Sequence, residues 1–512
     1  MSVEWSEGYV TDVNYTFGYY GELNPSRSVL PLIANGYQPP TFRAGCELGF
    51  GQGLSLALHA ALQPNIDWCG TDFNPAHASF AQSLVDTAEG KARLYDEAFA
   101  EFCERRDLPD FDFIGLHGVW TWISNENRKV LVDFIRRKLK PGGVLYISYN
   151  TNPGWAASAP LRHLLKRHAD IMGVPGEGAA ARIDGAIDFV ERLLDAKPGY
   201  LQANPSVAER FKRLKTQDRS YIAHEYMNRD WQPMSFGEVE EWLSDAKLSF
   251  VCSAHTLDHT TGINLTPDQS ALIQTVSDAS LRETVRDYCT NQQFRRDYWI
   301  KGPRKLSASA QVEAFRALRV VLVTPRADWP TTAPGVLGPA DLNPTVYGPI
   351  LEFLADHEPH AIAEVVDGLA EGLNLAQVSQ ALSILQGLGV VQPAAEPEVC
   401  KQSAAASRAL NKTLAARALS ETAASHLTSP ITGAAINATR VQQLFWLAHK
   451  AGEEGSEALA KSAWLALRSI NQVLVKDGIA LQTEDENLDQ LRDQARAWTE
   501  NLLPVWTKLA VV

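Results

Sequence analysis

The residues best suited to chemistry begin with an acid and three closely spaced glycines. The segment reads Glu47-Leu-Gly49-Phe-Gly51-Gln-Gly53, and the apolar run behind it predicts a helix over residues 54–62. Glycine lets the backbone approach a ligand closely, and a helix N-terminus favours anionic groups. A dinucleotide fingerprint is spaced G-x-G-x-x-G. The G-x-G-x-G spacing here instead points to a ligand with a carboxylate, an amine and a ribose.

An acid follows at the tip of the next expected strand. Residues 66–71 predict a strand, and Asp72 comes directly after it, 23 residues beyond Gly49. An acid about 20 residues past such a glycine turn is placed to accept hydrogen bonds from ribose hydroxyls. Glycine turns often serve tight packing only, but a strand, turn, helix, strand and acid in this order indicate a nucleoside-type cofactor. Phe73 and Asn74 continue the same loop.

The surrounding elements predict a parallel sheet. Strands are expected at 91–95, 111–116 and 144–149, with a helix over 125–139 between the last two. Strands that alternate with helices form parallel sheets with right-handed crossovers, and ligands bind outside the carboxyl ends of their strands. The polar and aromatic residues gather at those ends: Asp72, Asp96, the segment 117–122 and the segment 149–155.

At this point the chain resembles a class I S-adenosylmethionine-dependent methyltransferase. Glu47-x-Gly-x-Gly-x-Gly53 is similar to the first motif of that family, Asp72 to its ribose acid, and Lys140-Pro-Gly-Gly143 to the turn before its fifth strand. Four further strings resemble bacterial methyltransferases with a "methyltransferase regulatory" domain, a group that includes rickettsial protein-lysine methyltransferases: Tyr15-x-Phe-Gly-Tyr-Tyr20, His117-Gly-Val-Trp-Thr-Trp122, Ser148-Tyr-Asn-Thr-Asn-Pro-Gly-Trp155 and His224-Glu-Tyr226. The similarity covers residues 9–265; the tail matches in layout only.

The resemblance implies a set of cofactor contacts. The backbone from Gly49 to Gly53 would pass under the methionine part of S-adenosylmethionine. Asp96 would accept from the exocyclic amine of the adenine, and Phe99 would pack on its face, although a core position for Phe99 is as reasonable. The full expected cofactor set is Glu47, Gly49, Phe50, Gly51, Gly53, Asp72, Phe73, Asn74, Asp96, Phe99, His117 and Gly118.

Methyl transfer is an in-line displacement, so the protein mainly positions and desolvates the two partners. A lysine acceptor must also lose its proton, and burial among aromatic rings lowers the pKa of an amine. Aromatic faces attract the sulfonium and the ammonium as well. The aromatic candidates are Tyr19, Tyr20, Trp120, Trp122, Tyr149 and Trp155, any of which can instead pack the edge of the sheet. The expected catalytic set is Tyr19, His117, Trp120, Tyr149 and Asn150.

Histidines are weaker candidates. His117 could orient a substrate or take a proton near neutral pH. The preferred interpretation is that its ring only hydrogen-bonds to the cofactor or to the backbone. His224 and Glu225 form either a lid over the site or a helix start. His255 and His259 have the spacing of helical metal ligands without a third ligand, so they are interpreted as structural and no metal site is predicted.

Composition bounds the class of protein. The 512 residues, 45% apolar and 21% charged, are typical of a soluble protein with several domains, about three by common domain size. The net charge of −13 argues against broad nucleic-acid binding. The six cysteines are scattered, and the first residues lack a basic and an apolar signal segment. We therefore expect a cytoplasmic protein with no membrane insertion.

The fold class expected is α/β: a Rossmann-like methyltransferase sheet with a helical insertion, followed by a mainly α region. The predicted domains are 1–265 with an insertion at about 156–220, a helical regulatory domain at 266–330, a winged-helix-like domain at 331–400 and a helical domain at 401–512. Residues 327–400 contain no Lys or Arg but ten Asp or Glu. Phosphate contacts dominate DNA affinity, so the winged region is expected to bind protein or form a homodimer.

The preferred hypothesis is an S-adenosylmethionine-dependent methyltransferase acting on lysine amines of a protein, since a large accessory half suits a large substrate and an acidic body attracts lysine-bearing segments. A small-molecule N- or O-methyltransferase with an oligomerisation tail is the second hypothesis. The third is a cofactor-binding regulator without turnover. The intact glycine turn and Asp72 count against the third.

Overall fold

The computed structural model describes residues 8–9, 17–174, 178–369, 371–420 and 424–512. Its centre is a seven-stranded sheet with the order β3-β2-β1-β4-β5-β7-β6. The strands are β1 (Ala44–Leu48), β2 (Asp67–Thr71), β3 (Arg93–Tyr95), β4 (Phe111–Leu116), β5 (Leu139–Asn150), β6 (Leu248–Ser253) and β7 (Phe294–Lys301). The first five run parallel, whereas β7 is antiparallel to both β5 and β6. The predicted α/β class and Rossmann-like sheet are confirmed.

Helices cover both faces of this sheet. They are α1 (Pro25–Ala34), α2 (Leu54–Leu62), α3 (Pro75–Thr87), α4 (Phe99–Glu104), α5 (Asn125–Lys138) and α11 (Phe236–Ser244). Every residue of β1 and β4 is buried, as expected for central parallel strands sandwiched between helices. One face packs around Phe102, Phe134 and Trp299, and the other around Phe50, Trp68 and Tyr298. The strand ends that carry the polar loops are thereby held rigidly.

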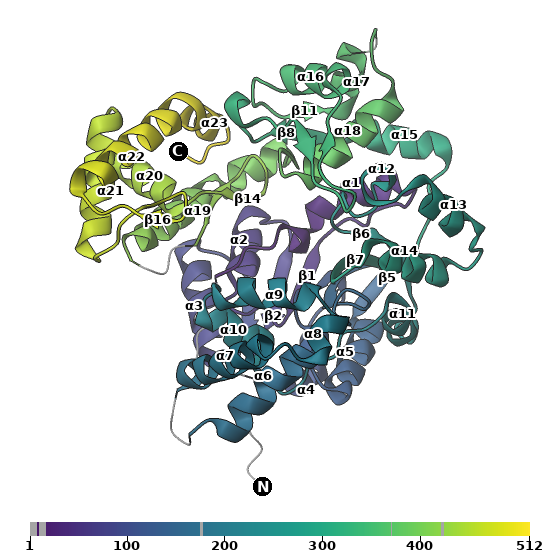
Figure 1. Cartoon of the computed structure of the whole chain (residues 1–512). Helices are drawn as coiled ribbons and strands as arrows, with labels where there is room; N and C mark the ends of the chain where they lie inside the picture. Colours follow the sequence, from purple (N-terminus) through teal and green to yellow (C-terminus); the bar gives the residue numbers. More distant parts are fainter. Residues whose placement is uncertain (1–7, 10–16, 175–177, 370, 421–423) are drawn as a thin grey trace.

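A helical insertion follows β5. It consists of α6 (Ala159–Met172), α7 (Ala179–Asp195), α8 (Gly199–Ala203), α9 (Ser206–Lys215) and α10 (Arg219–Tyr226), with its own apolar core around Leu165, Ile187 and Phe211. Figure 1 shows these helices gathered at one end of the molecule, opposite to the α16–α18 region. The predicted insertion at about 156–220 corresponds to the first four of these helices.

The segment 266–330 differs from the prediction of helices alone. Helices α12 (Thr261–Asn264), α13 (Pro267–Thr275), α14 (Ala279–Thr290) and α15 (Ala308–Ala317) are interrupted by β7, which enters the central sheet. The sequence of β7 does not show the usual alternation of apolar and polar residues, because two of its buried residues, Arg295 and Asp297, are charged. These two residues pair with each other. The segment therefore belongs partly to the methyltransferase core.

The next unit contains helices around a small sheet. Helices α16 (Pro344–Phe353), α17 (Ile362–Gly368) and α18 (Leu375–Gly387) pack on β8 (Arg319–Leu322), β11 (His360–Ala361) and β12 (Val391–Pro393), which form a three-stranded antiparallel sheet. A two-stranded antiparallel ribbon, β9 (Thr332–Ala333) and β10 (Ala340–Asp341), lies between β8 and α16. Whether this unit is a winged helix stays a prediction.

The C-terminal region shares its core with the methyltransferase domain. It comprises α19 (Pro397–Ala416), α20 (Arg440–Lys450), α21 (Ser456–Ser469), α22 (Glu484–Ala497) and α23 (Leu503–Lys508), with the hairpins β13 (His426–Ser429)–β14 (Ala434–Asn437) and β15 (Val475–Lys476)–β16 (Ile479–Ala480). Leu410 and Leu414 of α19 pack with Leu54 and Leu58 of α2 in one buried cluster. Within the described ranges, no helix is long and apolar enough to span a membrane.

Candidate active site

A deep pocket opens at the carboxyl ends of β1, β2 and β4, where parallel sheets bind ligands. Its empty volume, including the part open to solvent, is about 1080 Å³. The residues that line it include Tyr9, Tyr20, Glu47, Gly49, Phe50, Gly51, Asp72, Phe73, His77, Glu97, Ala98, Phe99, His117, Gly118, Val119 and Trp122. Nine of the twelve residues expected from the sequence to contact the cofactor lie on its wall. The other three, Gly53, Asn74 and Asp96, do not line this pocket.

The glycine turn forms the floor of this pocket. Gly49 and Gly51 adopt left-handed backbone angles, with φ of +74° and +56°. A Cβ on Gly49 would lie 2.6 Å from the Val119 side chain, so a larger residue would clash with the wall. Gly53 does not line the pocket: its Cβ would meet Ala81 of α3 at 2.4 Å. This third glycine therefore serves the packing of α3 against the start of α2.

Glu47 is the unusual group of the turn. It is 3% exposed, and its Oε2 has no hydrogen-bond partner in the described part of the chain. Burial, with Asp72 nearby, raises its pKa to about 8. A buried carboxyl without a partner is costly unless a ligand satisfies it. An ammonium group of a bound ligand would supply the missing donor.

Asp72 is held in place from three directions. Its Oδ2 accepts from the Gly51 amide at 2.8 Å, and its Oδ1 accepts from the Asn74 amide at 3.0 Å. The Nδ1 of His77 lies 3.0 Å from Oδ1. The carboxylate thus joins the first glycine turn to the start of α3. Asn74 itself points away as the cap of α3 and does not line the pocket.

The loop after β3 differs from the prediction by one residue. Asp96 is exposed and absent from the pocket wall, whereas Glu97, Ala98 and Phe99 line it. One carboxylate oxygen of Glu97 binds Arg105 at 2.6 Å; the other, Oε2, is buried without a hydrogen-bond partner among the described residues. Glu97 is therefore better placed than Asp96 to accept from an exocyclic amine, with the Phe99 ring beside it.

These residues fit S-adenosylmethionine. An orphaned buried carboxyl at Glu47 suits the amine of its methionine part, Asp72 suits the ribose, and the unsatisfied oxygen of Glu97 suits the adenine amine. Gly118 has φ of +64°, and nothing lies within 4 Å of where its Cβ would be, so the backbone leaves open space over the pocket. The chain would hold the cofactor by these groups.

A second pocket adjoins the first. It has an empty volume of about 940 Å³, again including open solvent, and is lined by Tyr20, His117, Gly118, Trp122, Asn150, Trp155, Arg210, Tyr221, His224, Glu225, Gln293 and Phe294. Four residues, Tyr20, His117, Gly118 and Trp122, belong to both pockets. A group bound in the second pocket would meet a cofactor across these shared residues.

The shared wall centres on His117. Tyr20 stacks on its ring with 3.6 Å between centroids, and its Nδ1 lies 2.7 Å from the Tyr146 hydroxyl. Burial lowers the pKa of His117 to about 4, so the ring is neutral at pH 7. The next residue, Gly118, donates its amide to Ser148 Oγ at 2.8 Å. The geometry favours a positioning role for His117 over proton transfer.

The outer part of the second pocket comes from the helical insertion and β7. Trp122 and Trp155 provide aromatic walls, and the Arg210 guanidinium lies 3.7 Å above the Trp155 ring. Asn150 exposes its amide to this pocket while its backbone is bound by Thr121 and Met234. Arg210, Tyr221, Gln293 and Phe294 were not predicted, because no local sequence pattern ties these distant segments to the site.

Three expected catalytic residues lie elsewhere. The Tyr19 hydroxyl is 3.0 Å from His59 Nε2 and accepts from the Ala435 amide, at the junction with the C-terminal region. Trp120 is fully buried, with its Nε1 donating to Met234 Sδ. Tyr149 is 1% exposed and donates to Asp297. None of the three lines either pocket.

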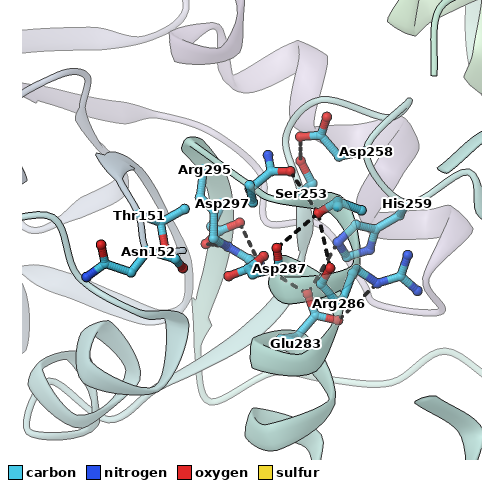
Figure 2. A network of polar contacts seen from close by, with 12 residues as sticks. Thr151, Asn152, Ser253, Asp258, His259, Glu283, Arg286, Asp287, Arg295 and Asp297 are labelled. Atoms are coloured by element: carbon cyan, nitrogen blue, oxygen red, sulfur yellow. Dashed lines mark hydrogen bonds and ion pairs between the residues drawn. The ribbon is translucent and has the colours of Figure 1, made fainter. Parts of the chain in front are cut away.

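A buried ionic network around Arg295 and Asp297 lies next to Tyr149 in the fold; Figure 2 shows its charged members. Arg295 contacts Asp297, Asp287 and Glu283 at 2.9, 2.7 and 3.1 Å, so one guanidinium faces three carboxylates. The Tyr149 hydroxyl donates to Asp297 at 2.8 Å. Asn150 directly follows Tyr149, and Phe294 directly precedes Arg295. The network therefore holds the strand ends that line the second pocket.

The two spaced histidines belong to the same region. His259 Nε2 lies 3.4 Å from Glu283 Oε2, and Figure 2 places its ring beside the helix α14 carboxylates. Burial lowers the pKa of His255. Across the described ranges, no group of three or more His, Cys, Asp or Glu has the arrangement of a metal site.

Comparison with known proteins gives the class. A family described as a predicted methyltransferase regulatory domain matches residues 218–301. An uncharacterized protein of Synechocystis is 38% identical over 512 residues, covering 99% of both chains. An uncharacterized protein of Rickettsia prowazekii is 24% identical over 283 residues, which cover 54% of this chain and 49% of that one.

The fold of the whole chain also matches that of a solved structure. PKMT2 from Rickettsia typhi, in complex with AdoHcy, superposes with a TM-score of 0.67 over 97% of this chain and 99% of that one, at 16% identity. The fold is thus shared from end to end. The chain belongs to the family of the Synechocystis protein. It has the fold of an S-adenosylmethionine-dependent methyltransferase and carries a predicted methyltransferase regulatory domain.

Proposed function

We propose that this methyltransferase transfers the methyl group of S-adenosylmethionine to lysine amines of a protein substrate. S-adenosylmethionine supplies an electrophilic methyl group on a sulfonium. The acceptor side chain enters the second pocket and reaches the cofactor past the wall shared by Tyr20, His117, Gly118 and Trp122. These shared residues are the observation that carries the proposal.

The lining of the second pocket supports an amine acceptor. Rings from Tyr20, Trp122, Trp155 and Phe294 surround it, and aromatic faces attract cations and desolvate an amine. Glu225 adds one carboxylate. Such a lining suits a long, flexible side chain that carries a positive charge. Among the described lining residues, Arg210 is the only Arg or Lys that could anchor a phosphorylated or carboxylated metabolite.

The size of the chain supports a protein substrate. Residues 302–512 lie beyond the last strand of the methyltransferase sheet, and the net charge of −13 favours encounters with lysine-bearing segments. The structurally similar protein of Rickettsia typhi bears the name PKMT2. A metabolite as acceptor would leave the large accessory half without a role in recognition.

The first test is calorimetric binding of S-adenosylhomocysteine, followed by transfer of a tritiated methyl group into two pools, bacterial proteins and bacterial metabolites. The proposal expects label in protein, recovered as methylated lysine after hydrolysis. Label in metabolites alone would overturn the lysine assignment and favour a small-molecule enzyme. Binding without any transfer to either pool would favour a regulator without turnover.

A further inference from the structure

We propose that Glu225 is the catalytic carboxylate of the second pocket: it binds the ammonium of the acceptor lysine and removes its proton before methyl transfer. This inference rests on the proposed function and adds the residue that prepares the nucleophile. Glu225 lies in α10, the first helix of the matched regulatory domain. The domain would therefore contribute directly to catalysis.

The position of Glu225 is the first support. It lines the second pocket together with Trp122, Trp155 and Asn150, and it is the only carboxylate among the described lining residues. In the part of the chain that the structure describes, its carboxylate makes no hydrogen bond or ion pair, and Arg162 donates to its backbone oxygen only. A half-buried acid without a partner, facing a pocket, is available to a ligand.

The charged groups around Glu225 do not neutralise it. Arg162 of α6 donates to the backbone oxygens of Glu225 and Asn228. Arg210 of α9 lies over Trp155 and donates to Gln293 Oε1. Among the described residues, the phenols of Tyr9 and Tyr221 also lie near it, and the rings of His117 and His224 line the same pocket.

Burial sets the affinity of Glu225 for a proton. It raises the pKa of this carboxyl to about 7, although Arg162 and Arg210 lower it. An acid with a pKa near the working pH is ionised often enough to accept a proton and basic enough to take one. The neighbouring His117 has its pKa lowered to about 4 by burial, so it is much the weaker base.

The proton balance is simple. One N–H bond of the lysine ammonium breaks, an O–H bond forms on Glu225, and the nitrogen keeps the electron pair. That pair forms the new N–C bond as the C–S bond of S-adenosylmethionine breaks and its electrons stay on sulfur. The Asn150 amide, which faces the same pocket, is placed to hold the remaining N–H groups. Glu225 then returns its proton to water through the open side of the pocket.

The test uses the full chain, S-adenosylmethionine and acetylated peptides with a single lysine and no other ionisable side chain. Wild-type protein is compared with Glu225→Gln, Glu225→Asp and the matched control Glu241→Gln, an exposed glutamate of α11. Single-turnover rates are measured from pH 6 to pH 9. Calorimetry gives the affinity of the S-adenosylhomocysteine-loaded protein for the peptide at pH 6 and pH 8.

Wild type and Glu241→Gln should show rates that rise about tenfold per pH unit below pH 7 and level above it. Glu225→Gln should be at least about 30-fold slower and should keep rising to pH 9, because only unprotonated lysine then reacts. Peptide affinity of wild type should fall about tenfold from pH 8 to pH 6, and that of Glu225→Gln should not change. Glu225→Asp should keep the wild-type shape of the pH profile.

The two proposals fail in different ways. If wild-type protein binds S-adenosylhomocysteine but labels no lysine in protein or peptide, the proposed function fails. If wild type labels lysine and Glu225→Gln does so with the same rate and pH profile, the function stands and the role of Glu225 is refuted. Unchanged affinity of each variant for S-adenosylhomocysteine shows that the variant is folded.

Discussion

Replacing Glu47 with Gln tests how the protein holds the amine of its cofactor. Glu47 is 3% exposed, its Oε2 has no described partner, and its pKa is raised to about 8 by burial. At pH 7 the free protein therefore carries this group about 90% protonated. A ligand ammonium needs the ionised form, so binding should release about 0.9 proton at pH 7.

The cost of ionising Glu47 gives the magnitude. With a pKa of about 8, that cost is about 1.4 kcal/mol at pH 7 and about 3.4 kcal/mol at pH 5.5. Because the ionised form binds and a raised pKa favours the protonated form, affinity must fall as the pH falls. Wild-type affinity for S-adenosylhomocysteine should drop about 30-fold from pH 7 to pH 5.5. Glu47→Gln cannot ionise and should lack this part of the pH dependence.

The assay is isothermal titration calorimetry at pH 5.5 and pH 7 in two buffers of different ionisation enthalpy. The difference between buffers gives the protons released. The variant keeps His77 and Asp72 in the same pocket, so a pH dependence common to both proteins is assigned to other groups. Equal proton release by wild type and Glu47→Gln would refute the assignment of the ligand amine to Glu47.

Three other substitutions probe separate parts of the structure. Asp72→Ala removes the acceptor for a ribose and should weaken S-adenosylhomocysteine binding by about 10- to 150-fold; calorimetric affinity within threefold of wild type would contradict the ribose role. Tyr19→Phe breaks the contacts with His59 and Ala435 and should lower the free energy of unfolding in urea by about 1–3 kcal/mol, while cofactor affinity stays unchanged. A loss of cofactor affinity would instead indicate that Tyr19 belongs to the active site. Arg295→Met removes the guanidinium that faces three buried carboxylates and should cost about 3–5 kcal/mol, measured as a lower melting temperature; an unshifted melting curve would show that this cation does not stabilise the fold.

The cofactor turn was predictable because its chemistry is local. Gly49, Gly51 and Asp72 follow short apolar strands, and the pleat of a parallel sheet brings such loops to one edge. The adenine side was less predictable. Asp96 and Glu97 are adjacent acids after a strand of three residues, and the sequence does not show which one turns inward. A difference of one residue reverses the direction of a side chain near a strand end.

The same rule explains why only some of the aromatic candidates line the two pockets. Neighbouring side chains of an extended segment point to opposite sides, so Tyr149 and Asn150 of β5 cannot both face the second pocket. Asn150 faces it, and Tyr149 turns to Asp297. Likewise Tyr20 stacks on His117 whereas Tyr19 turns to His59. Choosing one member of each pair required knowledge of which face of the sheet carries the site.

The matched regulatory domain is physically part of the enzyme's core. Residues 218–301 supply β6 and β7 of the central sheet, Glu225, Gln293 and Phe294 of the second pocket, and Arg295, which pairs with Asp297. Removing this segment would expose the edge of β5 and leave its apolar face without cover. Regulation by release of a separate inhibitory domain is therefore inconsistent with this architecture. Any control exerted through the segment would act on the central sheet and on the second pocket, because the segment contributes to both.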